Sequence, residues 1–180
     1  MSNSKTKVVT GVVRLSYCHL WEPAAITEGA KPKFSVSLII RKDDKETIDK
    51  INSAIDAAIE EATATKFGGK KPNKATLKGA ALRDGDEKDD EAYKGSFFLN
   101  ASSNEAPQIV DKNVNPILDR SLCYSGCYAR VSINFYAYAV SGQKGIAVGL
   151  GNVQVVKEGT PLGGKASASS DFKATNEEFI

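Results

Sequence analysis

The chain has no marked excess of charge of either sign. Its 180 residues include 24 Lys and Arg against 22 Asp and Glu, a formal net charge of +2 at pH 7. The global basic field of a histone-like protein is therefore absent, and any nucleic acid would have to be held by local positive charge. Long apolar runs are missing too. No stretch has the length of a membrane span or of a secretory signal core, so we expect a soluble cytosolic protein without membrane contact.

Cysteine and histidine are scarce. Cys18, Cys123 and Cys127 make an odd number, and His19 is the single histidine. An odd count argues against a disulfide framework, and a zinc site would lack ligands. Carboxylates gather at residues 83–95, but their spacing is not that of a calcium loop, and no nucleophile, base and orienting group fall together. We therefore expect no metal, no cofactor and no enzyme activity, and interpret this stretch as an acidic surface loop.

One stretch, CYARVSINFYAYAV at residues 127–140, alternates between two kinds of side chain. One set is small or apolar and suits a core, whereas the other combines three tyrosines with an arginine and hydrogen-bonding residues. Flat rings beside a guanidinium are what a sheet uses to stack unpaired bases and hold their backbone. The apolar set is Cys127, Ala129, Val131, Ile133, Phe135, Ala137 and Ala139, and the other set is Tyr128, Arg130, Ser132, Asn134, Tyr136 and Tyr138.

A packing role for these tyrosines is an equally supported interpretation of this strand alone. Tyrosine favours strands, and rings at period two can form a cross-strand ladder or lie beneath a helix. Arg14, Tyr17 and Trp21, on the first predicted strand, are weaker candidates for the same binding surface. A lone tryptophan such as Trp21 is more often a core or rim anchor than a ligand contact.

The first half of the chain predicts two strands and one long helix. Residues 8–21 and 34–41 alternate as strands, with Gly11 as the expected site of a bulge or sharp coiling. From Asp43 the period changes to about 3.6, and four isoleucines fall on one stripe, so the helix must dock on a sheet or plug an open end of a barrel. Asp43 and Glu46 are spaced as a capping box for this helix.

The second half predicts further strands that end in a hairpin. Residues 96–103 form a short strand, and the turn at 141–145 joins the aromatic strand to residues 146–156. Gly149 and Gly151 in the returning strand leave room for a ligand or another backbone to approach.

A lysine-rich segment at residues 66–78 follows the predicted helix. Its lysines are spaced through glycines and a proline, so their ammonium groups can contact phosphates without reading sequence. Lys70, Lys71 and Lys74 are the candidates, and the alternative is a solvated basic loop.

The two ends of the chain are poor in residues to bury. We expect a frayed N-terminus at 1–7, one domain at 8–157 and a flexible tail at 158–180 that ends in acidic residues. The tail is either simple terminal disorder, or it competes with nucleic acid for a basic groove or docks partner enzymes.

Taken in order, four runs are similar to a known family: VRLSYCHLWEP, PKFSVSLIIRK, DEAYKGSFFLNASS and YSGCYARVSINFYAYAVSGQKG. The chain resembles phage-encoded single-stranded DNA-binding proteins over nearly all of residues 8–164. The resemblance implies a mainly β protein with one long α-helix, an oligonucleotide-binding (OB) fold with a partly open five-stranded barrel and additions. It also implies the cytoplasm of the bacterial host and a role in phage DNA replication or recombination.

The resemblance also gives the working hypothesis for function. We expect a non-catalytic protein that coats single-stranded DNA without strong sequence preference, with Tyr128, Arg130, Tyr136 and Tyr138 as its binding positions. Replication or recombination proteins are expected partners of the tail, and self-association on DNA is compatible with this role. One alternative is a phage structural or assembly protein without DNA binding. The other is a nuclease that uses the acidic loop, which we rank last because a catalytic frame is missing.

Overall fold

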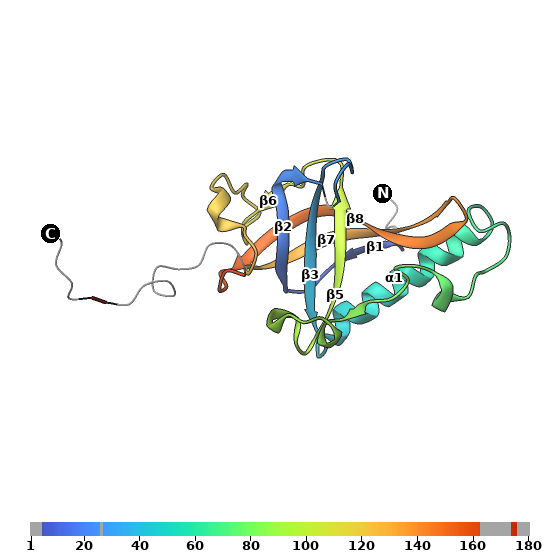
Figure 1. Cartoon of the computed structure of the whole chain (residues 1–180), viewed down its shortest axis with the longest axis horizontal. Coiled ribbons are helices and arrows are strands. Elements are labelled where there is room, and N and C mark those ends of the chain that lie inside the picture. Colours follow the sequence, from blue (N-terminus) through green and yellow to red (C-terminus); the bar gives the residue numbers. More distant parts are fainter. Residues whose placement is uncertain (1–4, 26, 163–173, 176–180) are drawn as a thin grey trace.

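The computed structural model is organised around a closed barrel of five strands (Figure 1). The barrel strands are β2 (Val13–Ala24), β3 (Lys33–Arg41), β5 (Ser96–Ser103), β7 (Tyr128–Val140) and β8 (Gln143–Lys157). Around the barrel, β2 pairs with β3, β3 with β5, β5 with β8, β8 with β7, and β7 again with β2. Among these five pairs, only β5–β8 is parallel. This is the pairing of an OB barrel, so the expected fold class is confirmed.

Shorter elements extend the barrel. The structure describes residues 5–25, 27–162 and 174–175, and no helix in these ranges is long and apolar enough to cross a membrane. Three short strands pair along β7, β5 and β8, respectively: β1 (Lys7–Val9), β4 (Arg83–Asp84) and β6 (Ile109–Val110). The short 3-10 helices are η1 (Lys74–Thr76), η2 (Gly85–Glu87), η3 (Glu91–Tyr93) and η4 (Arg120–Leu122).

Helix α1 (Lys45–Thr63) packs against β7 and β1. Its isoleucine stripe is buried as predicted, apart from half-buried Ile48. The predicted cap is wrong by one residue. Asp44 caps the helix, because its Oδ1 accepts from the Thr47 amide at 3.2 Å, whereas Asp43 faces solvent and pairs with Arg41.

The first predicted strand is in fact two strands. The chain bends at residues 10–12, so that β1 pairs with β7 and begins at Lys7, inside the segment expected to be frayed. The bend at residues 10–12 is the sharp coiling expected at Gly11, and a bulge lies further along the chain. The register shifts between Ser16 and His19, and Tyr17 between them has a φ of +47°. By strand alternation Tyr17 would point inward like the buried Val13 and Leu15, but the bulge turns its ring outward.

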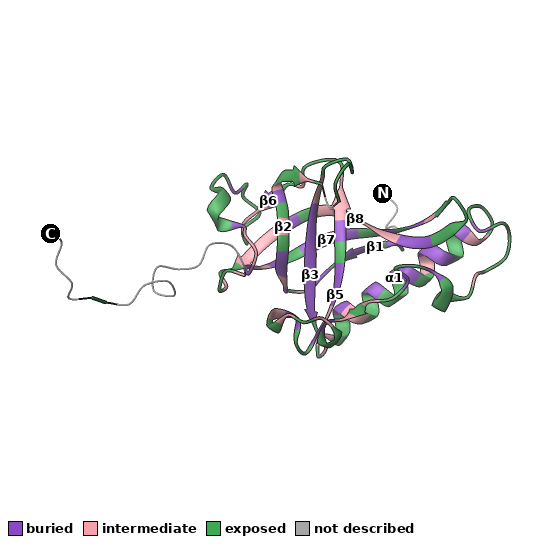
Figure 2. Cartoon of the chain, viewed as in Figure 1, coloured by how far each residue is buried: buried purple, intermediate pink, exposed green. Residues whose placement is uncertain are grey.

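The aromatic strand alternates as predicted along β7. Its apolar set is buried from Cys127 to Ala137, and its other set faces outward. Ala139 is the exception and is exposed, because the β7–β8 hairpin extends past the core (Figures 1 and 2). Helix α1 shares its core cluster with the buried set of β7, which includes Phe135 and Ala137. Tyr136 is exposed rather than covered by α1, although it borders a hollow with Ala58 and Glu61 of the helix.

Candidate nucleic-acid interface

The outer face of β2, β3 and β5 is lined with short polar side chains. Strand register places these residues in two rows that run across the three strands. Because the side chains are short, the surface above them is hollowed, with a space of about 360 Å³ between Tyr17, Lys88 and Asn100. The first row is Ser16, Ser37 and Asn100, and the second is His19, Ser35 and Ser102.

Two further hollows continue this surface. One of about 230 Å³ shares Asn100 and reaches Ala147 on β8, and one of about 460 Å³ shares Lys88 and includes Arg83. Since neighbouring hollows share lining residues, we treat the three as one depression and call it the outer groove. It combines an exposed ring, that of Tyr17, with two cationic side chains.

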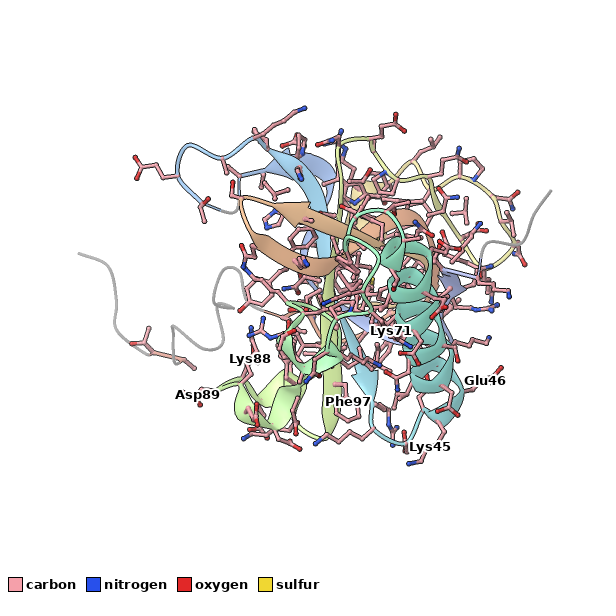
Figure 3. All side chains as sticks on the ribbon, turned by 90° about the vertical axis from the view of Figure 1, so that its right-hand side faces the viewer. Lys45, Glu46, Lys71, Lys88, Asp89 and Phe97 are labelled. Atoms are coloured by element: carbon pink, nitrogen blue, oxygen red, sulfur yellow. The ribbon has the colours of Figure 1, made fainter. Side chains whose placement is uncertain are left out.

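The outer groove lies where OB barrels bind oligonucleotides, on the face of their second and third strands between two loops. In this chain those strands are β3 and β5, and the loops are the β2–β3 connection and the β7–β8 hairpin. Figure 3 shows both loops on the same side of the molecule as Lys88, and α1 on the other side. Of the residues that line the outer groove, only Tyr17 was a candidate from the sequence.

Tyr136 and Tyr138 lie on the outer face of the β7–β8 ribbon. Tyr136 is exposed, whereas the Tyr138 ring folds across the opposite strand, where a Cβ on Gly145 would come within 2.7 Å of its Cζ. The space expected above Gly151 is occupied, because a Cβ there would clash with the Ser132 side chain. Gly145 and Gly151 thus make room for the protein's own side chains. The Tyr138 ring packs across the strand pair, as the packing interpretation expected, and base stacking by the tyrosines stays a prediction.

Arg14 and Tyr128 lie beside each other and contact residues 159 and 160, which follow β8. The Arg14 guanidinium lies 5.6 Å from the centre of the Tyr128 ring, and it donates to the carbonyls of Gly126 at 3.2 Å and Thr160 at 2.7 Å. A Cβ on Gly159 would lie 2.8 Å from the Tyr128 ring. These two candidates therefore have partners within the protein.

Trp21 and Arg130 are also engaged. The Trp21 indole packs against the core and donates to the Cys123 carbonyl at 3.0 Å. Arg130 Nε donates to the Thr10 carbonyl at 3.2 Å, although its side chain remains exposed. The anchor interpretation of the tryptophan is the one that its surroundings favour.

The chain stays anchored beyond the end expected for the domain. The Leu162 amide donates to the Ser125 carbonyl at 2.8 Å, and its side chain packs beside Ile39, Tyr93 and Phe98. Residues 158–162, expected to begin the flexible tail, thus contact the barrel in the structure. The rest of the tail lies outside the described residues, except 174–175.

The three candidate lysines lie near α1 rather than in the outer groove. Lys71 pairs with Glu60 at 3.7 Å and Lys74 with Asp56 at 2.9 Å, both on the helix, and Lys70 is exposed. Figure 3 shows Lys71 against the helix, well apart from Lys88. Their contact with phosphate stays a prediction.

The cysteines are free thiols, of which Cys123 and Cys127 lie in the core and Cys18 packs against it. Burial raises the pKa of Cys18 to about 12, and a hydrogen bond from Cys123 lowers the pKa of Cys127 to about 7. Within residues 5–25, 27–162 and 174–175, no group of three or more His, Cys, Asp or Glu is placed to hold a metal ion.

Comparison with known proteins identifies the family. The family model described as "Enterobacter phage Enc34, ssDNA-binding protein" matches residues 6–180. The chain belongs to this family. A putative protein p50 of Acyrthosiphon pisum secondary endosymbiont phage 1 is 31% identical over 97% of this chain and 98% of its own length.

Solved structures agree with this assignment. The single-stranded DNA-binding protein from bacteriophage Enc34, in complex with single-stranded DNA, is 25% identical, with a TM-score of 0.71 over 88% of this chain and 90% of its own. The bacteriophage T7 single-stranded DNA-binding protein gp2.5 shares the fold, at 16% identity and a TM-score of 0.59 over 97% of this chain and 98% of its own. The resemblance inferred from sequence is thereby confirmed.

Proposed function

We propose that this phage family member binds single-stranded DNA in the outer groove, stacking bases on exposed tyrosines and holding phosphates with cationic side chains. The observation that carries the proposal is the position of the groove, on the face and between the loops with which OB barrels bind oligonucleotides. Tyr17 is the central stacking residue, and Tyr136 and Tyr138 extend the surface along the hairpin. A relative solved with single-stranded DNA bound supports the same ligand.

Little base specificity is expected from such a surface. Ring faces accept every base, and four of the six residues in the two rows are serines, whose hydroxyls are short; Asn100 and His19 are the two longer hydrogen-bonding side chains. The protein would then coat single strands during phage replication or recombination as a binder rather than an enzyme. Docking of replication proteins by the tail, and self-association on DNA, belong to the same proposal.

The test compares labelled oligo-dT with a duplex of equal length by fluorescence anisotropy at several salt concentrations. The proposal expects salt-sensitive binding to the single strand and much weaker binding to the duplex. An external label is needed because Trp21, the single tryptophan, lies against Cys123 and would report poorly on the groove. Absence of salt-sensitive binding would favour the alternative, a phage structural or assembly protein.

A further inference from the structure

We propose that the acidic loop at residues 83–95 delivers a phosphate-binding lysine, Lys88, to the outer groove. The proposal rests on the binding of single-stranded DNA proposed above, and it assigns a ligand-contacting role to a segment whose composition argues against contact with DNA. The negative charge of a loop rich in carboxylates would repel nucleic acid. The structure shows instead that part of this charge is neutralised and that Lys88 forms no ion pair with the described carboxylates, although Asp84 and Glu87 line one of its two hollows.

Ion pairs with Lys42, the residue that follows β3, hold the N-terminal part of the loop. Lys42 Nζ lies 2.9 Å from Asp84 and 2.7 Å from Asp86, and the second carboxylate of this pair also accepts from the Gly95 amide at 2.8 Å. Two of the loop's carboxylates thus have a cationic partner that belongs to the barrel. This contact, which we call the Lys42 clamp, fixes both ends of the loop against the strand edge.

The C-terminal part of the loop is fixed by a buried ring. Tyr93 is fully buried outside the barrel, where its hydroxyl donates to Ser37 Oγ on the groove floor at 2.9 Å. Its ring meets Phe98 edge-on, with the ring centres 5.1 Å apart. The loop therefore covers one end of the outer face and borders the hollow.

Lys88 is held by aromatic rings. Its ammonium lies 5.0 Å from the ring centre of Tyr17, 4.8 Å from that of Tyr93 and 5.3 Å from that of Phe98. Ring faces attract a cation without cancelling its charge. None of the ion pairs among the described residues involves Lys88, and its neighbour Asp89 projects away from the molecule in Figure 3.

The ammonium is thus placed at a point shared by two hollows of the groove. Next to it stands the exposed ring of Tyr17. A phosphodiester beside a stacked base needs this pairing of a cation and a ring. The ligand class is the backbone phosphate of a single strand, whatever its base.

The test is the salt dependence of oligo-dT binding by Lys88→Met, which keeps an unbranched apolar side chain and removes the charge. Loss of one phosphate contact should flatten the slope of log K against log salt by about 0.7. Between 50 and 200 mM salt, wild type should then lose about 2.6-fold more affinity than the variant. Lys94→Met, an exposed lysine of the same loop, is the matched control and should keep the wild-type slope.

An unchanged slope for Lys88→Met, in a protein that binds oligo-dT as wild type does, would overturn this inference and leave the proposed function standing. Wild type without salt-sensitive binding would instead overturn the proposed function. Lys42→Met tests the clamp. If Lys42 acts only by holding the loop, adding its substitution to Lys88→Met should weaken binding no further, whereas additive losses would make Lys42 itself a phosphate contact.

Discussion

Tyr17 carries backbone strain in addition to an exposed ring. Its φ of +47° lies in the left-handed region, which costs a residue with a Cβ about 1–2 kcal/mol. Tyr17→Gly removes the ring and also the strain, whereas Tyr17→Ala keeps the Cβ. We expect the glycine variant to be more stable than the alanine variant by about 1 kcal/mol, as measured by urea unfolding. Equal stabilities would mean that the backbone relaxes at the bulge.

The binding role of the same ring predicts a loss without a change of salt slope. Tyr17→Ala should weaken oligo-dT binding by about 1–3 kcal/mol for the base that it stacks. The slope should stay as in wild type, because no charge is removed. Tyr136→Ala on the hairpin should behave in the same way. Trp21→Phe is a suitable control, since the Trp21 indole packs against the core and its affinity effect should be small.

Single residues could be predicted from sequence only where their neighbours are local. The inward and outward sets of β7 follow from a period of two and are confirmed up to Ala137. Lys88 could not be found, because its three rings come from residues 17, 93 and 98 and meet only after folding. The outward position of the Tyr17 ring also depends on a β-bulge, and strand propensities do not predict where such a bulge lies.

At the scale of elements, the N-terminus of α1 offers a test between two adjacent aspartates. Asp44→Ala removes the side chain that accepts from the Thr47 amide and should cost about 1 kcal/mol of stability. Asp43→Ala is the matched control. It breaks only an exposed ion pair with Arg41 and should cost less, because such pairs contribute about 0–1 kcal/mol. If urea unfolding showed a larger loss of stability for Asp43→Ala than for Asp44→Ala, Asp43 would be the cap, as the sequence predicted.

The Lys42 clamp predicts a dependence of stability on pH. Hydrogen bonds from Lys42 hold the pKa of Asp84 and of Asp86 below their ordinary range. A lowered folded-state pKa stabilises the fold above the unfolded value of about 3.9, and this stabilisation is lost as pH falls through the folded value.

Wild type should therefore lose more thermal stability below about pH 4 than a variant with both Asp84→Asn and Asp86→Asn. Melting temperatures at pH 7 and at pH 3 give the comparison. Parallel losses in the two proteins would show that the clamp does not form in solution.

The elements themselves were mostly predictable, and their interruptions were not. The helix stripe and the final hairpin follow from periodicity and a glycine-containing turn. The division of residues 8–21 into β1 and β2 depends on β7. Residues 132–134 of β7 pair with β1, and residues 128–129 pair with β2. A local pattern carries no information on such a partner.

At the scale of the whole molecule, barrel closure rests on sparse long-range contacts. β5 and β8 pair through Ser102 and Gly149 alone, although some fifty residues separate them in the chain. Periodicity could not predict that pairing, and the fold class came from the family resemblance. The outer groove could not be foreseen either, because it is built by β2, β3, β5 and β8 together.

The end of the domain is the last property of the whole molecule that can be tested. Thr160 accepts from Arg14, and Leu162 packs beside Ile39 and Phe98, so residues 158–162 cover one end of the outer face and leave the outer groove open. A chain that ends at 157 should lose about 2 kcal/mol through these contacts, a fall in melting temperature of about 4–8 °C.

A chain that ends at 162 is the control and should melt as the full chain does. Because both truncated chains lack residues 163–180, only the contacts of 158–162 distinguish them. If the two truncated chains melted together, the domain would end at 157, where the drop in apolar residues along the sequence had placed it.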